Sequence, residues 1–335
     1  MKTLLLFLPK AYLWQISNKK LHLIISGLVK LILICIISSS CNPGNNTKYK
    51  KQNFKADFKR IDDFHKAGNL KQVSISLDSL KPLLHASDIE NLTHYYIFRS
   101  QTVFPNKNLM NVYADSLLNL FESEEPKIRY KQNYIRALIL KSDVFLYFKQ
   151  YDKTLEQYFK VSLLLDKKND PANYSDFIGK IGQIYYLQGK FATAAKYQID
   201  AYNAIQQAKD VNPTNLFYIT QGALNNAGFS YERAEKLDSA LHFYKKNLAY
   251  ILNQEKKNDV SHAQVMSAKI VALDNIGGLY GKTGNFKLAR AYLEECIAIN
   301  NHSLETSKVP AFIKLAKVLS NTGYAKKADS ILVIT

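Results

Sequence analysis

Small and aromatic residues recur along the chain in a pattern with helical spacing. A small residue is followed three positions later by an aromatic residue and twelve positions later by a second small residue. The clear copies are Gly182/Tyr185/Ala194, Gly228/Tyr231/Ala240 and Gly277/Tyr280/Ala289. Looser copies are Ser142/Phe145/Thr154 and Ala316/Leu319/Ala328. A spacing of three places the first small residue and the aromatic residue on one face of a helix. No alternating run in the sequence predicts a strand. We therefore expect an all-α protein.

The small residues predict close contacts between antiparallel helices. We expect the first small residue mid-way along one helix and the second early on the next helix, where large side chains would keep the two backbones apart. A glycine inside a helix costs about 1 kcal/mol relative to alanine, so the use of Gly228 indicates a packing requirement. Seven residues after the first small residue, glycines mark the turn where a helix must end. These are Gly189, Gly284 and Gly323, and Glu235 stands at this position in the middle copy.

The pattern resembles the tetratricopeptide repeat (TPR), whose unit has about 34 residues. The stretches that begin at Ile178 and Leu273 match its consensus best, with Cys296 in place of the last alanine of the second stretch. The resemblance implies a TPR-like α-solenoid of antiparallel helix pairs that form a right-handed superhelix. About five copies would occupy residues 131–335, the last one incomplete, and residues 54–130 would form degenerate helical repeats. Because the copies lie 39 to 49 residues apart, their helices or loops must exceed the consensus length.

The first 40 residues resemble a lipoprotein signal peptide. Leu31–Ile37 is an apolar run of seven residues, too short for a bilayer that needs about 20, and Lys30 precedes it as the basic flank of a signal peptide would. The small residues Ser38–Ser40 then lead to Cys41. In the lipoprotein signal such a cysteine is diacylated and becomes the new N-terminus. The alternative is an uncleaved anchor helix that begins at Leu21.

Residues 41–53 are polar and read as a flexible tether. The signal and the repeats together resemble those of Bacteroidetes-type TPR lipoproteins. In such lipoproteins an acidic run after the cysteine marks export to the cell surface. No acidic run follows Cys41. The resemblance therefore implies a membrane-anchored lipoprotein on the periplasmic side of its membrane.

Charge and composition add limits on function. The net charge is +17, of which five lysines in residues 1–40 supply +5, leaving +12. These cations are spread along the chain without an arginine-rich cluster, so we expect no nucleic-acid partner. Three cysteines allow no disulfide framework, and the repeat position of Cys296 predicts burial.

Motifs for catalysis or cofactors are missing from the sequence. No HExxH or GxSxG motif occurs, and the glycines of residues 277–283 have the wrong spacing and context for a phosphate loop. We expect no enzyme activity, no cofactor, no metal and no small-molecule substrate. Asp-Ser pairs at residues 78, 115, 238 and 329 favour caps near helix N-termini. They also resemble the O-glycosylation acceptor of exported Bacteroidetes proteins.

These observations favour an adaptor or scaffold that binds an unknown protein or extended peptide and is attached to a membrane through its lipid anchor. The TPR resemblance implies that the first helices of the pairs line the inner groove. The residues expected there are Asn225, Glu232, Arg233, Asp274, Lys282 and Lys317. The alternative is the sensory TPR portion of a regulator, since related TPR regions precede a histidine kinase or a helix-turn-helix output domain.

Overall fold

The computed structural model describes residues 53–299 and 305–332. The chain divides into two units, Met1–Asn53 and Phe54–Thr335, and the helices of the described ranges belong to the second. The expected signal peptide, Cys41 and residues 41–52 of the tether lie outside the described residues.

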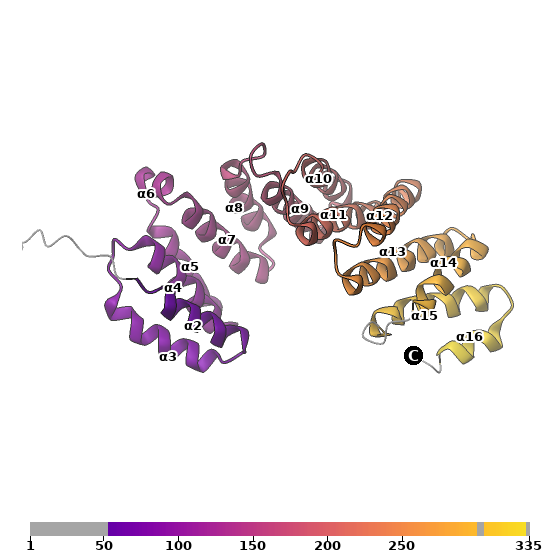
Figure 1. The fold of residues 1–335 in the computed structure, drawn as a ribbon, viewed down its shortest axis with the longest axis horizontal. Helices are drawn as coiled ribbons and strands as arrows, with labels where there is room; N and C mark the ends of the chain where they lie inside the picture. Colours follow the sequence, from indigo (N-terminus) through magenta and orange to yellow (C-terminus); the bar gives the residue numbers. More distant parts are fainter. Residues whose placement is uncertain (1–52, 300–304, 333–335) are drawn as a thin grey trace, which may run out of the picture. The chain divides into compact units, whose positions relative to one another are not determined.

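Every regular element in the described ranges is helical, as the sequence predicts (Figure 1). The first helices are α2 (Lys55–Lys66), α3 (Leu70–Leu80), the 3-10 helix η1 (Lys81–Leu83), α4 (Ile89–Thr102), α5 (Lys107–Asn119) and α6 (Glu124–Arg129). Next come α7 (Lys131–Tyr147), α8 (Tyr151–Leu164), α9 (Pro171–Leu187), α10 (Phe191–Ile205) and α11 (Pro213–Arg233). The last are α12 (Leu237–Lys257), α13 (His262–Lys282), α14 (Phe286–Ala298), α15 (Glu305–Asn321) and α16 (Ala325–Leu332).

The helices form antiparallel pairs, and each pair packs on the next. From α7 onward the pairs are α7/α8, α9/α10, α11/α12, α13/α14 and α15/α16. The first helices of neighbouring pairs also touch one another, α9 with α11, α11 with α13, and α13 with α15. These first helices therefore share one face of the stack.

Six pairs are closed by the same three-residue turn. Its middle residue has a positive φ in every case: Gly68, Lys149, Gly189, Glu235, Gly284 and Gly323. The next residue donates its backbone N–H to a carbonyl in the last turn of the first helix, as in Lys190 to Tyr185, Lys236 to Tyr231 and Asn285 to Tyr280, each at 2.9 Å. This is the bond of a Schellman cap. The aromatic residue of the sequence pattern therefore also supplies the carbonyl that ends the helix.

The large spacing between copies comes mainly from long helices. Helices α11, α12 and α13 have 21 residues each. The first small residue is not mid-way along its helix, as we expected, but nearer the C-terminal end, since Gly228 lies only five residues before the end of α11. The reason is that the aromatic residue and the turn that ends the helix both lie within the seven positions after the small residue.

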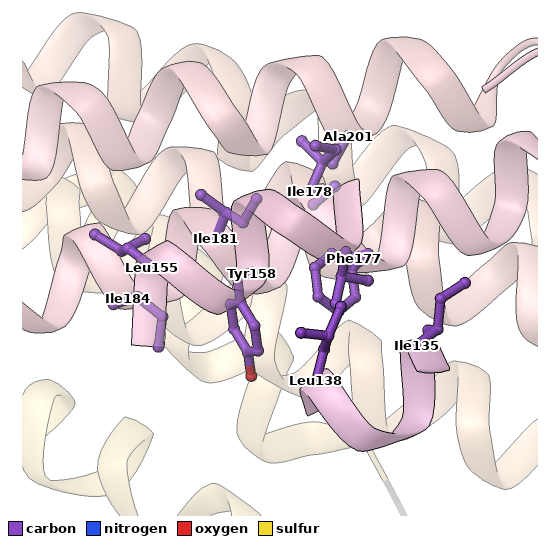
Figure 2. Close-up of a cluster of buried hydrophobic side chains, with 11 residues drawn as sticks. Ile135, Leu138, Leu155, Tyr158, Phe177, Ile178, Ile181, Ile184 and Ala201 are labelled. Carbon is purple, nitrogen blue, oxygen red and sulfur yellow. The ribbon is translucent and has the colours of Figure 1, made fainter. Parts of the chain in front are cut away.

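The core consists of several clusters that bridge neighbouring helices and pairs. One cluster joins Ile135 and Leu138 of α7 to Tyr158 of α8 and to Phe177 and Ile181 of α9 (Figure 2). The rings of Tyr158 and Phe177 meet edge to face, with centroids 4.9 Å apart. Each apolar face is thus covered by the next pair, as a stacked repeat requires.

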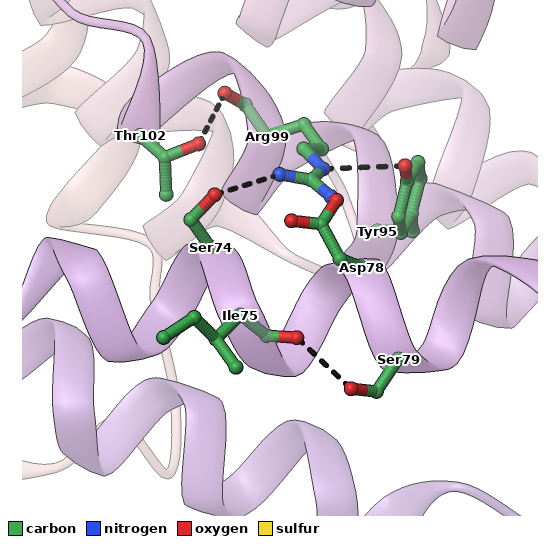
Figure 3. A network of polar contacts seen from close by, with 7 residues as sticks. All are labelled: Ser74, Ile75, Asp78, Ser79, Tyr95, Arg99 and Thr102. Carbon is green, nitrogen blue, oxygen red and sulfur yellow. Dashed lines mark hydrogen bonds and ion pairs between the residues drawn. The ribbon is translucent and has the colours of Figure 1, made fainter.

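A buried cation ties α4 to the preceding helix. Arg99 of α4 is 6% exposed and donates to Asp78 and Ser74 of α3 and to the Tyr95 hydroxyl (Figure 3). Lys141 of α7 likewise pairs with Asp115 of α5 at 2.7 Å. Our expectation that Asp78 and Asp115 lie near helix N-termini is wrong. Both lie in the C-terminal halves of their helices, because each is placed to meet a cation of the following first helix.

Candidate functional site

The three signature glycines lie where two helices of a pair touch. A methyl group added to Gly182 would meet the Gln198 side chain at 2.7 Å, on Gly228 the Tyr244 ring at 2.5 Å, and on Gly277 Leu293 at 2.7 Å. The partner lies sixteen residues after the glycine in each copy. The second small residues Ala194, Ala240 and Ala289 are fully buried in the fourth position of the second helix.

The signature tyrosines stack on an aromatic residue that the sequence pattern did not include. Tyr185 stacks on Tyr197 at 5.2 Å between centroids, Tyr231 on Phe243 at 5.6 Å, and Tyr280 on Tyr292 at 5.7 Å. The partner stands three residues after the second small residue each time. The stack fixes the first helix against the second beside the glycine contact. Because the spacing is the same in all three copies, the aromatic partner could have been found from the sequence.

Gly277 also belongs to the wall of a cavity between the first helices of three successive pairs. This cavity has a volume of about 530 Å³ and is formed by α11, α13 and α15 with the start of α14. Its apolar lining is Phe229, Leu279, Phe286 and Val318, and its charged lining is Glu232, Lys282, Lys314 and Lys317. A volume of this size suits a small ligand or a few side chains of a larger one.

The charged residues of the cavity are linked to buried groups behind it. Glu232 accepts a hydrogen bond from the Tyr244 hydroxyl at 2.9 Å, and its other carboxylate oxygen lies 3.9 Å from Lys282 Nζ. Burial, together with the negative charge of Glu232, raises the pKa of Tyr244, so this hydroxyl stays a donor. Lys314 Nζ lies 2.7 Å from Asp274 Oδ2.

Three of the six residues expected in the groove line this cavity: Glu232, Lys282 and Lys317. The other three lie on the same helices but are not part of the lining, and each contacts a neighbouring side chain. Asn225 accepts from the Asn275 side-chain amide at 2.8 Å, and Asp274 holds Lys314. Arg233 lies over the Phe191 ring at 5.3 Å.

Sequence reasoning missed the apolar part of the site. Phe229 and Phe286 line the cavity, and Tyr186 extends the aromatic surface toward α9, with its ring 5.4 Å from that of Phe229. Phe286 lies in the stretch from Leu273 that matches the repeat consensus, so nothing singled it out as a groove residue. Phe229 could have been found, because it stands at the groove position of α11 that Lys317 occupies in α15.

The described residues contain no cluster of three or more metal-binding side chains, and none of their helices is long and apolar enough to cross a membrane. Cys296 is buried, with its thiol 3.4 Å from the Ile270 carbonyl. Burial raises the pKa of the Cys296 thiol to about 12, which opposes formation of the nucleophilic thiolate.

Comparison with known proteins agrees with this architecture. A tetratricopeptide-repeat family model matches residues 270–303, the stretch that contains Gly277, Tyr280 and Ala289. A search of curated proteins found no match.

Two solved structures share the fold at low sequence identity. One is a STAND (signal transduction ATPase with numerous domains) protein with a tetratricopeptide-repeat sensor from Pyrococcus horikoshii, with a TM-score of 0.65 and 15% identity. The match covers 83% of this chain and 40% of that protein, so this chain spans less than half of its length. The apo form of RapI has a TM-score of 0.56 and 15% identity, with 83% and 74% covered. The chain has a TPR-like helical solenoid fold, which typically serves as a non-catalytic interaction scaffold.

Proposed function

We propose that this protein is a membrane-tethered, non-catalytic adaptor that binds an extended segment of a partner protein across α11, α13 and α15. The observation that carries the proposal is the cavity among three successive first helices, lined by both apolar and charged side chains. A groove of this kind presents anchors at regular intervals, which suits an extended chain better than a compact small molecule.

The membrane tether in this proposal is the lipid on Cys41. Its support is the order of the sequence, in which a short apolar run, small residues, a cysteine and a polar stretch follow one another ahead of α2, the first helix of the described ranges. Two acyl chains would hold the protein stably, whereas one chain alone binds only marginally. The repeats would then face the periplasm.

The partner-binding part can be tested by photo-crosslinking in the native membrane. A photoreactive amino acid replaces Phe229 in the cavity or, as the control, the exposed Lys196 on the second helix α10. We expect a discrete crosslinked partner from position 229 and none from position 196. Equal crosslinking from both positions, or crosslinking from position 196 alone, would show that the first-helix face is not the binding surface.

A second candidate function is the sensory region of a signalling protein. It is favoured by the likeness to the Pyrococcus structure, whose tetratricopeptide repeats are described as a sensor within a longer chain. The reading frame and its neighbours would separate the two functions. A histidine kinase or helix-turn-helix domain encoded in the same frame would favour the sensor, and diacylation of Cys41 would favour the adaptor.

A further inference from the structure

In the cavity of α11, α13 and α15 the wall formed by α13 has no side chain at two positions. Gly278 and Gly281 both line it. A methyl group on Gly281 would reach only ordinary contact with Val318, at 3.4 Å, and one on Gly278 would meet the flexible Lys314 side chain at 3.1 Å. Neither glycine is needed for the tight α13–α14 contact, which Gly277 makes. The space they leave lies beside Phe229 and Phe286, and it fits a bulky apolar side chain.

The rim of the same cavity carries more positive than negative charge. Lys314 is neutralised by Asp274. Lys282 has only a 3.9 Å contact with Glu232, whose other oxygen is held by Tyr244. Lys317 is exposed and forms no ion pair with any residue in the part of the chain that the structure describes. One carboxylate thus faces two cations, of which Lys282 is held by a single long contact and Lys317 by no ion pair among the described residues.

The two rim lysines are confined to the C-terminal pairs. The position of Lys317 is occupied by Asp143 in α7 and Gln183 in α9. The position of Lys282 is occupied by Tyr147 in α7 and Leu187 in α9. The cationic rim is therefore a property of this cavity and not of the whole first-helix face.

We propose that the cavity recognises a partner segment in which a bulky apolar side chain stands next to an aspartate or glutamate. The apolar side chain enters between Phe229 and Phe286, and the neighbouring carboxylate meets Lys317 and Lys282. This inference rests on the proposed function and adds the chemistry of the partner. Burial of the apolar side chain supplies affinity, and the opposite charges select the sequence and speed association.

The test uses a library of random octapeptides with both ends blocked, so that no terminal carboxylate is present. Peptides selected on the full-length protein are sequenced, and the affinity of the most enriched peptide is measured by calorimetry. We expect Asp or Glu directly beside Phe, Trp, Leu or Met. We expect Lys317→Glu to weaken binding about tenfold or more, equivalent to about 1.4 kcal/mol.

Two further variants serve as tests. One fills the apolar space of the cavity, and the other shows whether the charge effect is specific to the cavity rim. Gly281→Leu fills the cavity and should abolish binding while thermal unfolding shows an intact fold. Lys196→Glu makes the same charge change on α10 and should change the affinity by less than about twofold, because Lys196 is exposed and does not line the cavity.

The outcomes distinguish this inference from the proposed function. Enriched peptides without acidic residues, or unchanged affinity in Lys317→Glu, would refute the chemistry assigned here and leave peptide binding in place. If no peptide is enriched and position 229 captures no partner, both the inference and the proposed function are wrong.

Discussion

The contact between Gly228 and Tyr244 allows a sharp test of the repeat geometry. In Gly228→Ala the new methyl carbon would lie 2.5 Å and 2.6 Å from two carbons of the Tyr244 ring. Tyr244 is fully buried and its hydroxyl is bonded to Glu232, so the ring has little freedom to move. Either α11 and α12 separate, or the ring turns and its hydroxyl leaves Glu232.

The size of the effect follows from these alternatives. Overpacking a well-packed contact costs about 1–3 kcal/mol. Loss of a hydrogen bond to a charged group costs about 1.5–3 kcal/mol. Replacing glycine by alanine inside a helix returns about 1 kcal/mol. We therefore expect Gly228→Ala to lower the free energy of unfolding by up to about 2 kcal/mol if the hydroxyl bond survives, and by about 1.5–5 kcal/mol if that bond is lost as well.

The matched control lies on the same helix. A methyl group on Gly222 of α11 would meet no atom within 4 Å, so Gly222→Ala should raise the free energy of unfolding by about 0.5–1 kcal/mol. Urea unfolding followed by circular dichroism measures both, since 2 kcal/mol shifts the midpoint by about 1 M at a typical slope. Equal midpoints, or a higher one for Gly228→Ala, would refute the close contact.

Four other outcomes can be checked directly. Cys41→Ala should abolish labelling with a palmitate analogue and release the protein from membranes; unchanged labelling would rule out this lipidation site. Asp78→Ala should lower the free energy of unfolding by about 1–3 kcal/mol in a denaturant titration, because it removes a charged acceptor from the buried Arg99 guanidinium; a loss below about 0.5 kcal/mol would contradict this role. The Cys296 thiol, whose folded pKa is raised to about 12, should resist a thiol reagent at pH 8 until urea unfolds the chain. The free energy that the buried neutral thiol contributes to stability should be complete at pH values below the thiol's unfolded pKa of about 8.5. That contribution should be lost as the pH rises toward 12. Glu235→Gly should raise the urea midpoint, because a left-handed conformation costs a non-glycine residue about 1–2 kcal/mol.

The repeats could be predicted from sequence because their signature residues report local geometry. Gly228, Tyr231 and Ala240 are selected by a contact between two helices that are adjacent in the chain, so their spacing is regular and visible. The turn was recognisable for the same reason at Gly189 and Gly284. Glu235 and Lys149 adopt the same left-handed conformation without glycine, which indicates that helix packing is strong enough to impose the turn.

The site was less predictable because it depends on contacts between pairs. Asp274 and Lys314 are 40 residues apart, and so their ion pair leaves no local pattern. Arg99 and Asp78 show the same problem, since an Asp-Ser pair resembled a helix cap until its partner helix was in place. Lys282 and Lys317 were found from the register of first helices. Phe229 stands at the position equivalent to Lys317, but it was passed over because only polar residues were expected in the groove.

The fixed three-residue turn has a consequence for how such a chain can diversify. Six pairs close through the same turn, whereas the connections from one pair to the next vary, from residues 165–170 and 206–212 to the shorter 258–261. An insertion within a pair would break the Schellman bond and pull the tyrosine stack apart. Insertions between pairs leave both intact. Longer loops can therefore evolve only at the edge of the stack where one pair connects to the next. New loops there would border the N-termini of the first helices, whereas the turns at the opposite edge would keep their length.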